Sequence, residues 1–114
     1  MHELSIALSL LSIAEDEAER IGGKVRALHV KVGALSGVVK DALLFSYDVA
    51  SADTTLAGTR LHIEEVPVIV YCEQCREQRT LESPQLFVCP ACGAMTPDIR
   101  QGKELQLVSL EMES

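Results

Sequence analysis

The sequence is poor in aromatic residues. Its 114 residues include two Phe, two Tyr and no Trp, whereas residues classed as hydrophobic make up 47% of the chain. That hydrophobic fraction is ordinary for a globular protein, so the core must be built mainly from aliphatic side chains. A chain of this length predicts one domain, or one domain with a small appended lobe.

Positive charge and long apolar runs are also scarce. Ten Lys and Arg stand against 17 Asp and Glu, which gives a formal net charge of -7 and a pI near 4.8. This argues against nucleic acid as a partner, because nucleic-acid binding needs a basic footprint. No uninterrupted apolar run approaches the length of a membrane span. In a secretory signal, basic residues precede the apolar segment, but none precede the apolar segment 4–14 here. We therefore expect this segment to be a buried helix of a cytoplasmic protein.

Cysteine occurs four times, always as a member of a pair. Cys72 and Cys75 form one pair, Cys89 and Cys92 form the other, and thirteen residues separate the two. A Cys-x-x-Cys turn places two thiolates on one side of a loop, so two facing turns make a tetrahedral four-sulfur site that suits zinc and can also hold iron. The alternatives are disulfides or unrelated buried thiols. The spacing matches the metal-site pattern, and a reducing compartment favours metal over disulfide.

Hydrophobic periodicity predicts two helices. In residues 3–20, apolar positions recur at intervals of three and four and draw two stripes, so we expect a helix covered on two sides that stops at Gly22. A second helix is expected over 38–52, with Val39 on its inner face and Phe45 widening that face.

Alternating apolar residues predict three longer strands, at 24–32, 60–66 and 104–112. His29 and His62 fall on the polar faces of their strands, so both are interpreted as ordinary surface histidines. The order helix, strand, helix, strand, small lobe, strand predicts an α+β fold class. We expect two helices on one face of a three-stranded sheet, with an inserted zinc-ribbon lobe.

The inserted lobe is expected over residues 67–102, so that residues 1–66 plus 103–114 form the α+β domain. Two short apolar runs, 68–71 and 86–88, lead into the cysteine pairs and are predicted as ribbon strands. A unit of fewer than about 40 residues rarely folds without disulfides, a bound metal or oligomerisation. Because structural zinc contributes about 10–16 kcal/mol in small peptides, the metal should decide whether this lobe folds.

The N-terminus offers a second set of metal ligands. The Met1 α-amine, the backbone nitrogen of His2 and the His2 imidazole close two fused chelate rings, a field that suits Ni(II) or Cu(II) better than Zn(II). Glu3, a distant His or a partner can occupy a further position. Alternatively, His2 belongs to a frayed terminus and Glu3 is an ordinary partner of the helix dipole.

Several motifs, taken in order, resemble those of the HypA/HybF family of hydrogenase maturation factors. They are Met1-His2-Glu3-Leu4-Ser5, Gly33-Ala34-Leu35-Ser36, the two cysteine pairs and Gly102-Lys103-Glu104-Leu105, and together they span nearly the whole chain. The resemblance implies a nickel metallochaperone. It implies His2 as the essential nickel ligand with the Met1 amine and Glu3 beside it, and structural zinc on Cys72, Cys75, Cys89 and Cys92.

The resemblance also implies partners. They are the HypB GTPase, the large subunit of [NiFe]-hydrogenase that receives Ni(II) and, in some bacteria, the urease accessory proteins. Catalysis is not expected, because a zinc ion closed by four thiolates has no open position for water. The rival hypotheses are a zinc-ribbon adaptor without a nickel-transfer role and a nucleic-acid-binding ribbon, which the net charge opposes. Both a monomer and a weak or domain-swapped homodimer remain open.

Overall fold

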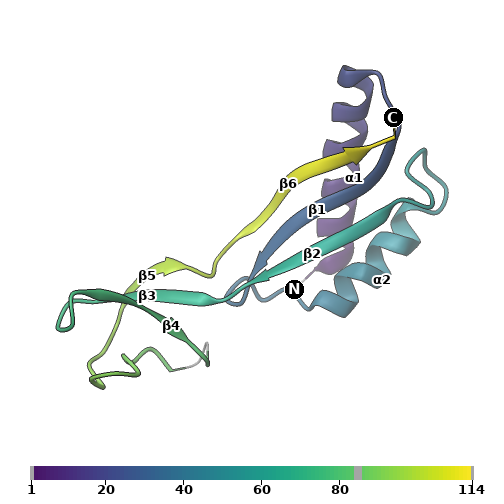
Figure 1. The fold of residues 1–114 in the computed structure, drawn as a ribbon. Helices are drawn as coiled ribbons and strands as arrows, with labels where there is room; N and C mark the ends of the chain where they lie inside the picture. Colours follow the sequence, from purple (N-terminus) through teal and green to yellow (C-terminus); the bar gives the residue numbers. More distant parts are fainter. Residues whose placement is uncertain (1, 84–85, 114) are drawn as a thin grey trace. The chain divides into compact units, whose positions relative to one another are not determined.

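Two helices and six strands make up the described part of the chain, which is residues 2–83 and 86–113 of a computed structural model (Figure 1). In chain order the elements are α1 (Glu3–Ile21), β1 (Val25–Gly33), α2 (Lys40–Ser51), β2 (Arg60–Val66), β3 (Val68–Cys72), β4 (Glu77–Leu81), β5 (Asp98–Gln101) and β6 (Leu105–Met112). The strands form two sheets, in the orders β2-β1-β6 and β4-β3-β5. No described helix has the length and hydrophobicity needed to cross a membrane.

Contacts divide the chain into two compact units. The first contains the described residues up to Lys31, residues 38–64 and those from Gln106 onward, and the second contains residues 32–37 and 65–105. The first unit carries both helices and most of the β2-β1-β6 sheet, while the second carries β3, β4 and β5. The predicted α+β class, with a four-cysteine lobe inserted before the last strand, is confirmed.

Helix α1 packs on the β2-β1-β6 sheet and against α2. Its buried residues are Ala7, Leu10, Leu11 and Ala14, which repeat at the helical period. The helix ends where Gly22 takes a left-handed conformation, with φ of 79°, and donates its N–H to the carbonyl of Ala18 at 2.8 Å. Glycine suits this position because it has no Cβ to clash there.

The expectation that α1 is covered on two sides was only partly right. The sheet and α2 both contact the helix, but Leu4, Leu8 and Ile13 lie beside the buried residues and are each about half exposed.

The expected inner face of α2 was partly wrong. The helix buries Leu43 and Tyr47 completely, whereas Val39 and Phe45 are 60% and 70% exposed. Val39 is the N-cap residue with extended backbone angles, so its side chain does not share the helical face of Leu43. Phe45 follows Leu43 by two residues, which places it on the opposite side of a helix of 3.6 residues per turn.

The buried Tyr47 ties α2 to the start of β2. Its hydroxyl is hydrogen-bonded to the hydroxyl of Thr59, which in turn donates to the carbonyl of Leu56 at 2.6 Å. Burial raises the pKa of Tyr47, so the phenol stays neutral and donates this bond.

In the second unit, β3 is the central strand and pairs antiparallel with both neighbours. Val68 lies opposite Leu81, and Val70 lies opposite Arg79 on β4 and Ile99 on β5. The buried core is small: Val68, Val70 and Leu81, with Leu35, Phe87 and Ile99 packed against it and partly exposed.

The ribbon strands differ from the prediction. The second short strand, expected at 86–88, is absent from the described residues, where Val88 forms a single bridge with Met95. The partner of β3 is instead β4, whose sequence Glu-Gln-Arg-Thr-Leu has little apolar alternation. Main-chain hydrogen bonds to β3 are sufficient to form this strand, because backbone pairing does not depend on side-chain polarity. The segment expected only to lead out of the lobe contains β5.

Two glycines allow the end of β1 to pass close to the residues that precede β6. The N–H of Gly33 donates to the carbonyl of Glu104, and the N–H of Leu35 donates to that of Gly102, both at 2.7 Å. A Cβ on Gly33 would lie 2.1 Å from the Gly102 oxygen, which no real Cβ tolerates. The backbone must therefore move if residue 33 carries any side chain.

We predict that Gly33→Ala lowers the free energy of unfolding by about 3 kcal/mol or more, because the clash is with backbone atoms that cannot rotate away. Gly22→Ala is the matched control: its left-handed φ costs roughly 1–2 kcal/mol, but a Cβ there meets no atom within 4 Å. Urea unfolding of both variants measures the difference. Equal losses of stability would contradict the proposed close approach.

Candidate metal sites

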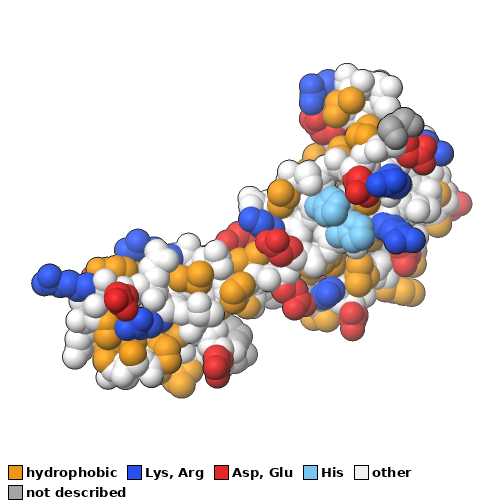
Figure 2. Space-filling model, viewed as in Figure 1, with side chains coloured by type: hydrophobic (Ala, Val, Ile, Leu, Met, Phe, Trp, Pro, Cys, Tyr) orange, Lys and Arg blue, Asp and Glu red, His pale blue; other side chains and the backbone are white. Residues whose placement is uncertain are grey.

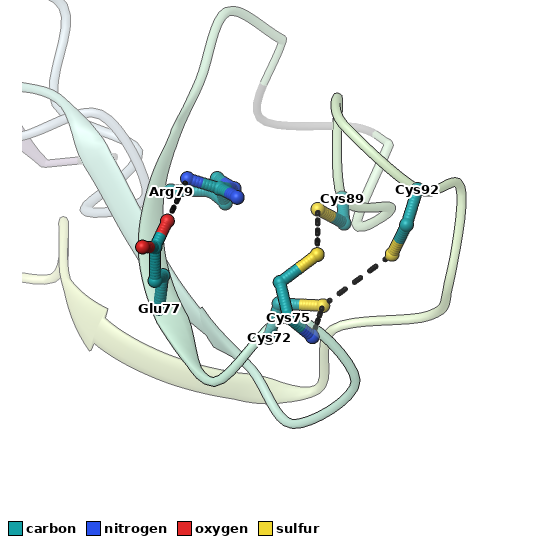
Figure 3. A network of polar contacts seen from close by, with 6 residues as sticks. All are labelled: Cys72, Cys75, Glu77, Arg79, Cys89 and Cys92. Carbon is teal, nitrogen blue, oxygen red and sulfur yellow. Dashed lines mark hydrogen bonds and ion pairs between the residues drawn. The ribbon is translucent and has the colours of Figure 1, made fainter.

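The four cysteines converge at one point in the second unit. Their sulfur atoms all lie within 4.8 Å of one another, and the two shortest described distances are 3.6 Å between Cys72 and Cys92 and 3.9 Å between Cys75 and Cys89. Each of these distances joins one Cys-x-x-Cys pair to the other, and Figure 3 shows the four sulfurs turned toward one another. A disulfide bond is only about 2.0 Å long, so these are four separate thiols.

Similar local geometry brings each pair into position. Cys72 ends β3, and its sulfur accepts a hydrogen bond from the N–H of Cys75 at 3.4 Å. The residue after each second cysteine, Arg76 or Gly93, has a positive φ and donates its N–H to the carbonyl of the first cysteine, at 2.7 and 2.8 Å respectively. Both loops therefore turn tightly, which directs both sulfurs of a pair to one side.

The sulfur geometry fits a tetrahedral metal ion. Zinc–sulfur bonds of about 2.3 Å place the sulfurs of a regular tetrahedron about 3.8 Å apart. The distances of 3.6 and 3.9 Å lie on either side of that value. Zn(II) held by the four thiolates would cross-link the two loops.

Electrostatics also favours a cation among the sulfurs. Burial opposes ionisation of the Cys89 thiol, but backbone N–H groups of Cys92 and Ala91 and the side chain of Arg79 together lower its pKa to about 6. The Ala94 N–H favours the Cys92 thiolate, but loss of solvent and hydrogen bonds with the neighbouring sulfurs raise the pKa of Cys92 to about 12. The thiols thus do not all ionise at neutral pH by themselves, whereas a bound metal ion lowers the pKa of every thiol it binds.

Arg79 is a contributor that the sequence analysis missed, because β4 was not predicted as a strand. Hydrogen bonds to the sulfurs of Cys89 and Cys75, followed by the bond to Glu77, raise the pKa of Arg79. Its Nη1 lies 2.7 Å from Glu77 Oε2 (Figure 3). A permanent cation beside the thiolates stabilises their charge and helps to orient them.

The predicted N-terminal ligands lie in the first unit. Met1 lies outside the described residues. His2 is the N-cap residue of α1, its side chain is exposed and makes no capping hydrogen bond, and its carbonyl accepts the N–H of Ile6 at 3.1 Å. The imidazole therefore does not cap the helix and can bind a ligand.

Glu3 joins the two helices. Its Oε2 accepts a hydrogen bond from the N–H of Val39, the N-cap residue of α2, at 3.2 Å. This bond is the main reason that the pKa of Glu3 is lowered, so its carboxylate is ionised at neutral pH. Val39 has no side chain that can cap a helix, and Glu3, 36 residues earlier, satisfies the exposed N–H instead. Sequence reasoning did not anticipate this contact.

We predict that removing zinc with a chelator unfolds the segment around the four cysteines while both helices remain. The small core of the second unit provides little stability without the metal, whereas the helices bury their own residues in the first unit. NMR should show collapse of the signals of residues 72–92, far-UV circular dichroism should keep most of its helical signal, and added Zn(II) should restore the spectrum. Removal should become easier on acidification, because protons compete for the thiolates. Unchanged dispersion of these signals in metal-free protein would contradict the prediction.

Comparison with known proteins gives a consistent result. The family model described as hydrogenase/urease nickel incorporation, metallochaperone, hypA matches residues 1–112. A hydrogenase maturation factor HypA from Roseiflexus sp. (strain RS-1) is 54% identical over 114 residues, covering 99% of this chain and 93% of that protein. The HypA of Chloroflexus aurantiacus is 50% identical over 112 residues, covering 97% and 98% of the two chains.

The fold matches as well. The solution structure of the Ni metallochaperone HypA from Helicobacter pylori aligns with a TM-score of 0.66 at 26% identity, covering 98% of this chain and 97% of that one. A second HypA solution structure aligns with a TM-score of 0.72 at the same identity. The family model matches nearly the whole chain, and the chain is 54% identical to a relative of that name. This chain therefore belongs to the HypA family of nickel-incorporation metallochaperones that act in hydrogenase maturation.

Proposed function

We propose that the chain carries Ni(II) at its N-terminus and keeps Zn(II) in the four-cysteine site. His2 is the essential nickel ligand, the Met1 amine and Glu3 complete its surroundings, and Cys72, Cys75, Cys89 and Cys92 hold the structural zinc. The observation that carries the nickel proposal is the state of His2: its side chain is exposed and free of any capping bond at the first turn of α1. The sulfur distances support the zinc assignment.

The chemistry of the N-terminus suits a transferred ion. The first N–H groups of a helix have no intrahelical acceptor, so Ni(II) can displace the His2 amide proton without breaking a helical hydrogen bond. The helix dipole opposes a cation there by only about 0.3–1 kcal/mol. The α-amine, with an ordinary pKa of about 7.7–8.0, must lose its proton, so nickel affinity falls as the pH drops. A site with few protein ligands at an exposed position exchanges its ion readily.

Glu3 has a double role in this proposal. Its charge favours a cation beside His2, and its hydrogen bond to Val39 keeps the first turn of α1 beside the start of α2. The carboxylate is ionised well into the acid range, which supports a contribution to cation binding at neutral pH.

The transfer route is proposed from the family. The chain hands Ni(II) to the large subunit of [NiFe]-hydrogenase with the HypB GTPase, in the cytoplasm, without catalysing a reaction itself. Urease accessory proteins are a further proposed destination. Residues 67–102 act as the zinc-stabilised domain, and residues 1–66 plus 103–114 act as the nickel-binding domain. The competing function is an adaptor that docks through its ribbon while His2 plays no part.

We predict that His2→Ala abolishes the tightest nickel binding and hydrogenase maturation. Zinc content and the helical signal should stay at wild-type values, because the exposed imidazole makes no capping hydrogen bond to α1. Ser5→Ala, an exposed change in the same helical turn, is the matched control and should bind nickel normally. Calorimetric titration with Ni(II) near pH 7.5 and elemental analysis of zinc provide the measurements. Wild-type affinity in His2→Ala would favour the adaptor.

We predict that Glu3→Gln and Glu3→Ala separate the two roles of Glu3. Gln keeps an oxygen for the Val39 N–H but loses the charge, so nickel affinity should fall about tenfold while stability at pH 7 stays near wild type. Glu3→Ala should lower both the nickel affinity and the stability at pH 7. The folded-state pKa of Glu3 is depressed, so its stabilising effect exists above the unfolded value of about 4.3 and is lost as the pH falls through the folded value. The difference in thermal stability between wild type and Glu3→Ala should therefore shrink on acidification. Full nickel affinity in Glu3→Gln would leave Glu3 with the structural role alone.

A further inference from the structure

A second group of metal-ligating side chains lies on the open face of the β2-β1-β6 sheet. His29 of β1, His62 of β2 and Glu111 of β6 each offer one donor atom, and these atoms all lie within 4.8 Å of one another. Figure 2 shows histidine side chains side by side on this face, and Figure 1, in the same view, has α1 behind the strands. The sequence analysis treated both histidines as ordinary surface residues, because it did not bring the three strands together.

We propose that His29, His62 and Glu111 form a binding site for a divalent late first-row transition ion such as Ni(II), Cu(II) or Zn(II). Two imidazole nitrogens and one carboxylate oxygen are ligands that these ions accept, and three protein donors leave positions open for water or an incoming ligand. The site uses none of the proposed ligands at the N-terminus or in the four-cysteine group.

The arrangement of the rings supports this assignment. The centroids of the two imidazoles are 4.7 Å apart, and their planes differ by 18°. Metal bonds of about 2.0–2.2 Å require donor atoms roughly 3.0–3.5 Å apart, so modest side-chain rotations close the distance. His62 is exposed and His29 is half-buried, which leaves at least one ring able to turn without disturbing the core. The histidines also line a surface hollow of about 360 Å³, which has room for an ion and its water ligands.

Two ion pairs lie close to these histidines. Arg26 contacts both oxygens of Glu111, with Nη2 3.2 Å from Oε1 and Nε 3.3 Å from Oε2. Lys31 and Glu64 line the hollow and lie 3.9 Å apart. Both side chains of the Arg26–Glu111 pair are exposed, and exposed ion pairs are weak, so a metal ion can take Glu111 from Arg26. The arginine thus competes with the metal for one of its three ligands.

The first test uses the full-length, zinc-loaded His2→Ala protein, in which His29 and His62 are the remaining histidines. Substoichiometric Cu(II) should selectively broaden the imidazole signals of both residues in long-range ¹H–¹⁵N NMR spectra. Titrations with Ni(II) and with Zn(II) should each show one further site. Adding His62→Gln, a change at an exposed position, should weaken that site at least about tenfold, because a direct ligand is lost. Because His2 is already absent and the NMR signals report on His29 and His62 directly, the result does not depend on the nickel-carrier proposal.

The second test uses the carboxylate and its competitor in the same His2→Ala background. Glu111→Gln should weaken the additional site about tenfold, whereas Arg26→Gln should strengthen it severalfold by releasing Glu111. Glu65→Gln is the charge-matched control, since Glu65 is exposed on β2 outside the donor group, and it should leave the affinity within about twofold of the parent. If one equivalent of each ion leaves the imidazole signals unchanged, the proposal is overturned and the two histidines are only a stacked pair. Equal affinities in Glu111→Gln and Glu65→Gln would also overturn the three-ligand site.

Discussion

Mutual repulsion among four closely spaced sulfurs is the constraint on which the second unit depends. The sulfur atoms lie within 4.8 Å of one another, so they cannot all carry negative charge unless a cation lies between them. The surrounding structure provides some of that positive potential through Arg79 and the backbone N–H groups near Cys89. A metal ion bound by the four sulfurs would supply the remainder.

The same constraint explains why so small a core is sufficient. Among the described residues, the buried cluster that supports the β4-β3-β5 sheet consists of Val68, Val70 and Leu81. The loop that carries Cys89 and Cys92 is closed on itself by one bridge, between Val88 and Met95, and by main-chain hydrogen bonds between its own residues. A metal ion bound by both cysteine pairs would join this loop to the end of β3 and replace the apolar contacts that a larger domain would use.

Much of the fold could be predicted from the sequence, because its signals are local. The period of α1, the alternation of β1 and β2 and the spacing of the cysteines are each contained in a short segment, and α1, β1 and β2 lie close to their expected positions. The four-sulfur group follows from the same kind of signal. The nickel ligands stay a prediction, supported by the family and by the exposed position of His2.

The remaining features depend on contacts between distant residues. β4 exists because β3 lies beside it, and its own sequence has no strand-like alternation. The bond from Val39 to Glu3 spans 36 residues, and the group on the open sheet face joins three strands. Local periodicity also misjudged Phe45, since it identifies an apolar residue without showing whether another element covers it. Such features can be identified only once the tertiary structure is known.

The apolar side chains left uncovered on α1 and α2 have a consequence for the colloidal behaviour of the protein. Leu4, Leu8, Phe45 and Val49 are each at least half exposed, and surfaces of this kind attract one another in water. At neutral pH the formal charge of -7 opposes that attraction through repulsion between molecules. Near the pI of about 4.8 the repulsion disappears, so mildly acidic solutions favour self-association through the helices even while each molecule stays folded.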